Sequence, residues 1–261
     1  MEAIRLWENA PLQIEGEEEP AIRYFPAENK QGDGTVIIFA GGGYMRRSAH
    51  EDEGYALFLN SLGLDAFVLD YRILPYRYPA ALIDARRAVR FVRANAEKFG
   101  VNPEKIAVMG SSAGGHLAAH VSTYRGNLEA EAHDALDQVD PTPNAQILCY
   151  AVTDHQAHLG SYKNLLGEEN LGIKDEVNPI LLADETAPPA FIWHTETDPA
   201  VKVTSTLAYA ARLHELDVRC EVHIYPEGGH GLGLANNNPS VRRWQKELEF
   251  WLKSKEYIVK I

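Results

Sequence analysis

Short, continuous apolar runs alternate with longer amphipathic stretches along most of this chain. Continuous runs rich in β-branched residues are typical of strands buried on both faces, and apolar positions every three or four residues are typical of helices. The runs that predict strands from residue 35 onward are 35–40, 64–69, 105–109, 146–152, 190–194 and, alternating as an outer strand should, 218–225. Strands that alternate with helices predict an α/β fold with a mostly parallel, doubly wound sheet and helices on both faces.

Helical spacing of apolar residues predicts helices over 53–62, 80–99, 200–215 and 241–253. Gly63 and Gly100 follow the first two as natural C-terminal caps. In the second helix the arginines fall largely outside the apolar stripe, and we interpret them as a solvated face. They are Arg86, Arg87, Arg90 and Arg93.

Some segments stand outside this alternation. Residues 1–34 are polar and glutamate-rich, with two short alternations that fit edge strands. Residues 126–143, rich in Glu and Asp, are typical of a surface excursion. Residues 156–187 form the largest insertion between predicted strands, and we expect them to be a lid over the site.

Length and composition indicate an ordinary globular protein. A chain of 261 residues fits a single α/β domain spanning 1–261, because such domains reach roughly 250 residues. No apolar run approaches the roughly 20 residues of a membrane helix, and the first residues lack a secretion signal. We therefore expect a cytoplasmic protein without a membrane partner. Cys149 and Cys220 lie in strand-like stretches, which favours reduced thiols without a structural disulfide.

The net charge of the chain limits the kinds of molecule it can bind. With 37 acidic against 25 basic residues, the formal net charge of −12 repels phosphate backbones and argues against nucleic acid. A neutral small-molecule substrate is not affected by this charge. We expect no cofactor and no metal, and a homo-oligomer is left open.

Residues 110–114, Gly-Ser-Ser-Ala-Gly, follow an apolar run and precede a run of helix formers. A Gly-x-Ser-x-Gly pattern between a strand and a helix is typical of a nucleophile elbow, a tight turn that lifts the serine hydroxyl out of the sheet. Only Ser112 has glycines both two residues before and two residues after it, whereas Ser111 is flanked by Met109 and Ala113. We predict Ser112 to be a nucleophile.

Three successive glycines, Gly41 to Gly43, come directly after the first buried strand and precede Tyr44. Glycines leave backbone N–H groups uncovered by side chains and free to point at a ligand, which an oxyanion hole requires. The competing interpretation is a flexible loop. The position of the run, at a strand end and upstream of the elbow, favours the oxyanion hole.

A serine hydroxyl needs a histidine to take its proton and a carboxylate to hold the histidine tautomer. His230, with glycines on both sides, follows the last predicted strand, and Asp198 follows the strand before it, in the order Ser, Asp, His. Glu196 is the competing acid. Asp198 also fits a helix N-cap before Pro199, and we expect one side chain to fill only one of these two roles.

Other polar residues at strand ends are assigned lesser roles. We expect Arg72 to anchor its loop by pairing with Asp70 or a neighbour. Asp154 and His155 point apart as adjacent residues, so we interpret them as pocket lining. Tyr44 and His155 are the predicted substrate-binding residues, with Arg46 and Arg47 as further polar lining. Histidines expected at surface or packing positions are His116, His120, His133 and His223, while His194 is expected in the core or beside the site.

Together these motifs resemble the α/β-hydrolase superfamily, and within it the small carbohydrate-esterase group that includes acetyl xylan esterase-like and feruloyl esterase-like proteins. The likeness covers most of the chain from residue 35 onward. The segments that carry it are 41–44, 70–75 with 78–79, 84–88, 110–117, 198–199 and 229–231.

The resemblance implies a serine hydrolase without a cofactor. It implies Ser112 as nucleophile, His230 as base and Asp198 as acid. It further implies oxyanion donors from the N–H groups of Gly42, Gly43 and Ala113. Ala40 stands where lipase-type esterases carry a histidine, so the substrate preference of a lipase does not carry over.

The leading hypothesis is an esterase that removes small acyl groups from a sugar or short oligosaccharide, with acetyl as the favoured group. A serine peptidase of the acylaminoacyl or dipeptidyl peptidase type shares the elbow and the order of the triad, but such enzymes usually carry a propeller domain for which 261 residues leave no room. A binding protein on the hydrolase fold typically loses a triad residue, and all three candidates are present here.

Overall fold

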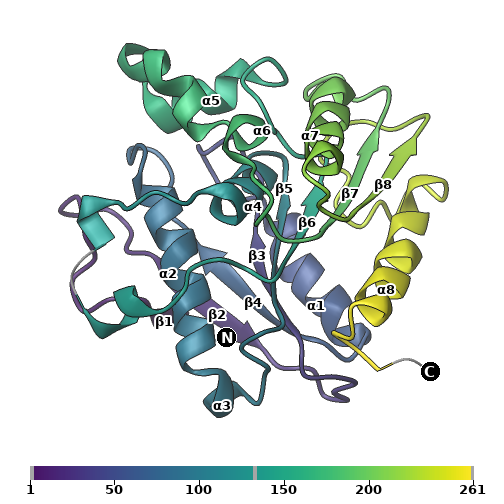
Figure 1. Cartoon of the computed structure of the whole chain (residues 1–261), viewed down its shortest axis with the longest axis horizontal. Helices are drawn as coiled ribbons and strands as arrows, with labels where there is room; N and C mark the ends of the chain where they lie inside the picture. Colours follow the sequence, from purple (N-terminus) through teal and green to yellow (C-terminus); the bar gives the residue numbers. More distant parts are fainter. Residues whose placement is uncertain (1–2, 132–133, 260–261) are drawn as a thin grey trace.

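The computed structural model describes residues 3–131 and 134–259. Within these residues, one sheet of eight strands has the order β1-β2-β4-β3-β5-β6-β7-β8 (Figure 1). The strands are β1 Ala3–Arg5, β2 Ala21–Phe25, β3 Thr35–Phe39, β4 Asp65–Asp70, β5 Ile106–Ser111, β6 Ala145–Cys149, β7 Ala190–Thr195 and β8 Cys220–Tyr225. β1 and β2 pair antiparallel at one edge, and β3 to β8 pair parallel, which confirms the predicted fold class.

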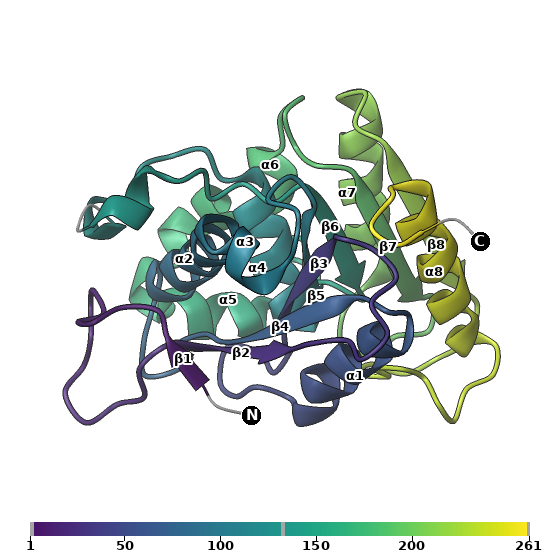
Figure 2. The same ribbon diagram turned by 90° about the horizontal axis from the view of Figure 1, so that it is seen from below.

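Helices cover both faces of the sheet. They are α1 Glu53–Ser61, α2 Ala80–Ala94, α3 Ala96–Phe99, α4 Ser112–Thr123, α5 Leu159–Leu166, α6 Pro179–Leu182, α7 Val203–Glu215 and α8 Trp244–Ser254. Buried residues of α1 and α8 pack into one core, and those of α2, α4 and α7 pack into the other. Figure 2 shows α1 and α8 on the side of the sheet opposite α2 and α4. No helix in the described residues is both long and apolar enough to cross a membrane.

Strand register sets the position of the site. Gly110 of β5 lies opposite Phe39 of β3 and Leu148 of β6. The carboxyl ends of these parallel strands are therefore level, and the loops that follow them meet at one edge of the sheet, where α/β folds carry their ligand sites.

The α2 arginines are not a solvated face, so that interpretation is wrong. Arg86, Arg87 and Arg90 are buried, and the stretch after α4 packs on them through two short 3-10 turns, Glu129–Glu131 and Ala135–Gln138. The Arg86 and Arg90 guanidiniums lie 2.5 and 3.1 Å from one carboxylate oxygen of Glu131, and Arg87 binds Asp134. Helical periodicity could not anticipate this, because the acidic partners come from a segment without periodicity.

Arg72 does anchor its loop, but its partner is Asp84 rather than Asp70. The Arg72 guanidinium donates to both Asp84 carboxylate oxygens at 2.6 to 3.0 Å, and the pair is fully buried. Asp70 instead accepts from Arg23 at 3.0 Å. The predicted helix over 80–99 is also interrupted at Asn95, which separates α2 from α3.

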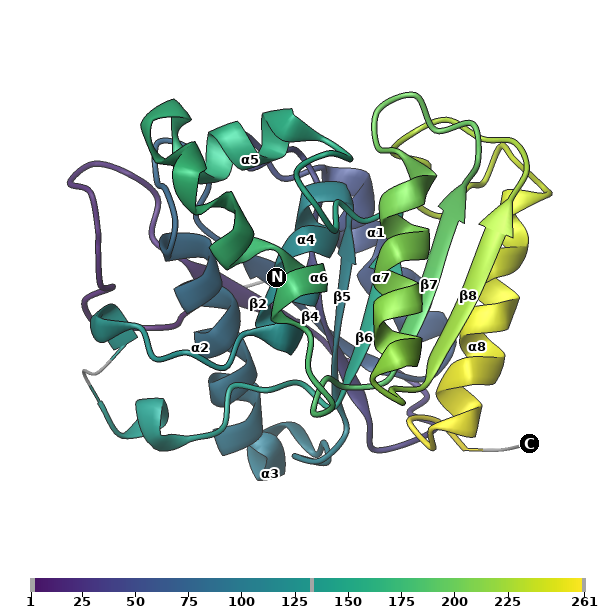
Figure 3. The same cartoon turned by 45° about the horizontal axis from the view of Figure 1, so that its top comes forward.

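The 156–187 insertion folds as α5, a 3-10 helix Glu168–Val177, and α6. Figure 3 shows α5 on the side of the molecule toward which the parallel strands point. The Asn164 amide of α5 donates to the Gly43 carbonyl at 2.8 Å, so the insertion touches the glycine loop. Cys149 and Cys220 are free thiols, and burial raises the pKa of each to about 12.

Candidate active site

Ser112 lies at the junction of β5 and α4 with a φ of 53°, in the left-handed region that non-glycine residues rarely adopt. The turn is this tight because its neighbours are glycines. A Cβ at Gly110 would lie 2.1 Å from the Gly114 carbonyl oxygen, and a Cβ at Gly114 would lie 2.1 Å from the Phe39 oxygen. Any larger residue at either position would push α4 off the sheet and move the Ser112 hydroxyl.

His230, in the loop after β8, connects Ser112 to Asp198. Its Nε2 lies 2.8 Å from Ser112 Oγ, and its Nδ1 lies 2.7 Å from Asp198 Oδ2. Because a carboxylate only accepts, the proton of the neutral imidazole sits on Nδ1, and Nε2 is left to accept from the serine hydroxyl. The structure thus brings together all three predicted triad residues, which are 118 and 32 residues apart along the chain.

Asp198 is not the N-cap of the helix, whose N-cap residue is Lys202, but its carboxylate both closes a turn and faces His230. Oδ1 accepts from the backbone N–H groups of Ala200 and Val201 at 2.8 and 2.9 Å, while Oδ2 faces His230. One oxygen therefore closes the turn, and the other orients His230. Helix α7 begins only at Val203, so the turn that Asp198 closes precedes the helix.

Hydrogen bonds stabilise the charge of Asp198. Burial by itself would raise the pKa of this carboxyl, but bonds from His194, His230 and two backbone N–H groups hold the pKa well below its usual range. His194 is fully buried in β7 and lies 3.3 Å from Asp198 Oδ2, as expected for a residue beside the site. Glu196, the competing acid, is exposed.

The glycine loop lies against Ser112. A Cβ at Gly41 would be 3.2 Å from the Ser112 Cβ, and the Gly41 N–H donates to Glu51 Oε2 at 2.9 Å. In the described residues, no protein acceptor takes the N–H of Gly42 or Gly43, whose φ angles are 133° and 65°. Ala113 is the second residue of α4, where a backbone N–H has no acceptor within its helix. These three donors remain available for a ligand.

The predicted substrate-binding residues differ in exposure. Tyr44 is buried, and its hydroxyl lies 2.6 Å from Nδ1 of His116, itself buried, with a pKa lowered to about 4 by desolvation. Its side chain therefore packs against Tyr71 and His116 next to the glycine loop and is not exposed to a ligand. His155 is half-buried, and its Nδ1 has no protein partner among the described residues. Arg47 is occupied by Glu18 and the Tyr71 carbonyl.

The remaining histidines behave mainly as packing residues. His120 is buried, whereas His223 is half-buried on β8. His133 lies outside the described residues. His158 was not singled out from the sequence, yet it lies close enough for His230 to help lower its pKa, after the larger effect of desolvation. Its Nδ1 accepts from the Ser161 N–H at the start of α5, so it links the insertion to the site.

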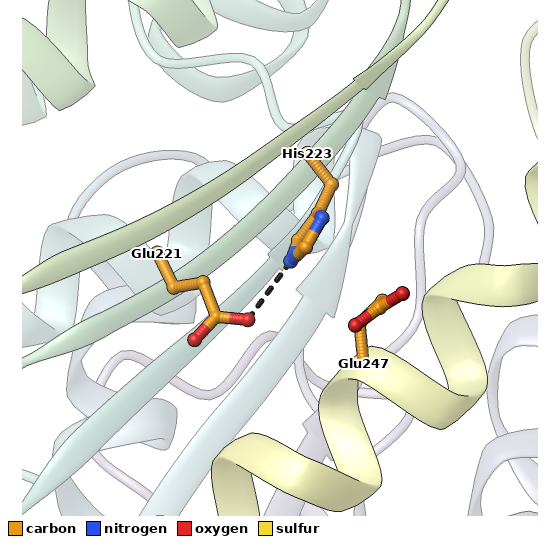
Figure 4. A group of neighbouring side chains, drawn as sticks. All are labelled: Glu221, His223 and Glu247. Atoms are coloured by element: carbon orange, nitrogen blue, oxygen red, sulfur yellow. Dashed lines mark hydrogen bonds and ion pairs between the residues drawn. The ribbon is translucent and has the colours of Figure 1, made fainter.

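One group in the described part of the chain has the donors to hold a metal ion: Glu221 and His223 of β8 with Glu247 of α8 (Figure 4). Their ligand atoms lie within 4.8 Å of one another. His223 Nε2 is 2.9 Å from Glu221 Oε1, so this pair is satisfied as a hydrogen bond or ion pair. The group belongs to the outer strand and its covering helix, and none of its residues contacts the triad side chains.

Comparison with known proteins gives a consistent result. A family model described as BD-FAE matches residues 23–213. An acetylxylan esterase from Xylanibacter ruminicola is 30% identical over 243 residues, covering 88% of this chain and 47% of that protein. Endo-1,4-beta-xylanase B from Butyrivibrio fibrisolvens is 32% identical over 77% of this chain and 33% of its own length. The chain thus spans between a third and a half of these two relatives.

A solved structure covers the chain almost completely. The acetyl ester-xyloside bifunctional hydrolase from Caldicellulosiruptor lactoaceticus superposes with a TM-score of 0.93 at 38% identity, over 98% of this chain and 97% of that one. The fold is the α/β-hydrolase fold, as the resemblance in the sequence implied.

Proposed function

The chain belongs to the BD-FAE family. From that premise we propose that it is a serine esterase that removes small acyl groups from sugars or short oligosaccharides, with acetyl as the leading candidate. The observation that carries the proposal is the continuous hydrogen-bonded series from Ser112 through His230 to Asp198. The names of the relatives support the substrate class, since one is an acetylxylan esterase and a solved neighbour is an acetyl ester-xyloside hydrolase.

In the first half-reaction, Ser112 Oγ attacks the ester carbonyl carbon while its proton passes to His230 Nε2. The Asp198 carboxylate stabilises the imidazolium that forms and keeps the ring in place. The carbonyl oxygen becomes an oxyanion and accepts hydrogen bonds from the N–H groups of Gly42, Gly43 and Ala113. The tetrahedral intermediate collapses when His230 gives its proton to the leaving sugar oxygen, which leaves the acyl group on Ser112.

In the second half-reaction, water replaces the sugar. His230 Nε2 takes a proton from the water as the water oxygen attacks the acyl carbon, and the same donors hold the second oxyanion. Return of the proton to Ser112 Oγ releases the carboxylic acid and the free enzyme. No cofactor or metal takes part in this scheme.

Substrate contacts come from the loops around Ser112. We assign His155 to contact with a substrate hydroxyl or carbonyl, because its Nδ1 lacks a protein partner in the described residues. Tyr44 contributes indirectly, because its buried side chain packs on Tyr71 and bonds His116 next to the glycine loop. The 156–187 insertion, bonded to Gly43 through Asn164, is the proposed lid, and residues 1–261 form one catalytic domain.

The test compares wild type with Ser112→Ala on p-nitrophenyl acetate, butyrate and octanoate, then on acetylated xylo-oligosaccharides and a peptide p-nitroanilide. We expect acetate to be cleaved fastest, and the variant to lose at least about a thousandfold in kcat. Ser122→Ala is the matched control, because it removes another buried serine hydroxyl of α4, which within the described residues bonds only the Ala118 carbonyl.

Wild-type turnover no greater than that of Ser112→Ala on every ester would overturn the esterase proposal. Faster cleavage of the anilide than of the acetylated oligosaccharide would favour a peptidase instead.

A further inference from the structure

Glu51 is a buried acid that the proposed reaction scheme does not use. It ends the short 3-10 turn Ala49–Glu51, between the glycine loop and α1, and is 2% exposed. Among the described residues no lysine or arginine pairs with it, and its only ionisable neighbour at ion-pair distance is the His50 ring at 3.7 Å. A buried carboxylate is costly unless hydrogen bonds satisfy it, so the identity of its donors is informative.

One carboxylate oxygen binds the glycine loop. Oε2 accepts from the Gly41 N–H at 2.9 Å. The loop is closed around this contact, because Ser48 N–H donates to the Gly41 carbonyl and Glu51 N–H donates to the Ser48 carbonyl, each at 2.9 Å. Fixing the Gly41 peptide fixes the direction of the following N–H groups of Gly42 and Gly43, which the proposed scheme uses for the oxyanion.

The other oxygen binds the loop that carries His230, through a tyrosine. The Tyr150 hydroxyl donates to Glu51 Oε1 at 2.5 Å and accepts from the Gly233 N–H at 2.9 Å, three residues after His230. The Tyr150 ring also meets the His230 ring edge-on, with centroids 5.1 Å apart. Burial, with the nearby Glu51 charge, holds the pKa of Tyr150 well above its usual value, so the phenol keeps the proton it donates.

We propose that Glu51 is a positioning residue: with Tyr150, its carboxylate holds the oxyanion loop and the His230 loop at a set separation on either side of Ser112. This inference rests on the proposed esterase function. Gly41 and Gly233 are almost two hundred residues apart in sequence, and each is one hydrogen bond from this carboxylate or from the tyrosine bound to it. Interactions that are realised only in the transition state depend most on such spacing.

The kinetic consequence is specific. Displacing oxyanion donors or the base by about 1 Å lowers the rate of the chemical step by around a hundredfold while leaving substrate binding nearly intact. We therefore expect Glu51→Ala to lower kcat on p-nitrophenyl acetate by ten- to a hundredfold, with KM changed less than about threefold. Glu51→Gln keeps one carbonyl oxygen for the Gly41 N–H, so it should recover part of that loss.

Tyr150→Phe separates positioning from folding. It removes the hydroxyl that joins the two loops while keeping the ring against His230, and we expect about a tenfold lower kcat. Its matched control is Tyr209→Phe in α7, which removes an equally buried tyrosine hydroxyl, bonded to Gln146 Oε1 of β6 at 2.9 Å. With turnover measured per folded molecule, only Tyr150→Phe should lose kcat.

The outcomes separate this inference from the proposed function. If wild type cleaves esters but Glu51→Gln and Tyr150→Phe keep the wild-type kcat, or if Tyr209→Phe loses kcat equally, the positioning role is wrong and the esterase stands. Should Glu51→Ala fail to fold, Tyr150→Phe and Glu51→Gln decide. Wild type that neither cleaves esters nor is labelled on Ser112 by a fluorophosphonate would overturn both proposals.

Discussion

Buried carboxylates around α2 and at the carboxyl edge of the sheet are neutralised in different ways. Around α2, arginine guanidiniums pair with acids, as Arg72 does with Asp84 and Arg86 with Glu131. At the carboxyl edge of the sheet, Asp198 and Glu51 are also buried, but in the described residues their partners are backbone N–H groups, imidazoles and a tyrosine hydroxyl.

This difference in the partners of the carboxylates indicates the role of each region. A guanidinium held against a carboxylate cancels its charge and leaves it little influence on other groups. Neutral donors satisfy a carboxylate while leaving its negative charge in place, so Asp198 can still stabilise a positive charge that forms on His230. We expect changes around α2 to alter folding stability, and changes at the strand ends to alter turnover.

Asp198→Asn should give the largest effect. The amide would face His230 with a donor, so the proton would move to Nε2 and the ring could not accept from Ser112. We expect kcat/KM per folded molecule to fall by about 10³- to 10⁴-fold. The measurement is steady-state hydrolysis of p-nitrophenyl acetate beside urea unfolding. A variant that unfolds easily but stays active per folded molecule would contradict the division between regions.

Asp84→Asn should have the opposite profile. It leaves the buried Arg72 guanidinium without its carboxylate, which costs about 3–5 kcal/mol of unfolding free energy. Urea denaturation followed by fluorescence measures this loss, and kcat of the folded fraction should stay within about twofold. Asp134→Asn is the control, because this partner of Arg87 is partly exposed and such pairs contribute at most about 1 kcal/mol.

The dependence of folding stability on pH should show whether Asp198 is charged in the folded protein. Its pKa is depressed in the folded protein, so its stabilising contribution is present above the unfolded value of 3.8 and is lost as pH falls below it. Wild type should therefore lose more stability between pH 5 and about pH 2 than Asp198→Asn does, measured by thermal melts across that range. Parallel losses in the two proteins would mean that Asp198 is not held as an anion.

Glu196→Gln should have the smallest effect. Its side chain is exposed two residues from Asp198, so we expect less than a twofold change in kcat/KM and no change in stability. A loss of kcat/KM comparable to that of Asp198→Asn would show that Glu196, and not Asp198 alone, acts as the acid.

Local patterns in the sequence predicted much of the fold. The parallel strands β3 to β7 were found to within a few residues, because a strand buried on both faces must be continuously apolar and is bounded by turn residues, and β8 was found from its alternation. The elbow was equally local, since the left-handed turn at Ser112 requires small residues at Gly110 and Gly114. The chain order of Ser112, Asp198 and His230 followed from strand ends, and the catalytic roles of these residues stay predictions.

The tertiary structure alone decided the partners of the charged residues. Arg72 pairs with Asp84, and Arg86 and Arg87 pair with Glu131 and Asp134. The Asp198 carboxylate uses one oxygen to close a turn and the other to bind His230. The link from Gly41 through Glu51 and Tyr150 to Gly233 left no pattern in the sequence either. Periodicity reports which face of an element is buried, whereas hydrogen bonds between loops depend on where distant strands end in space.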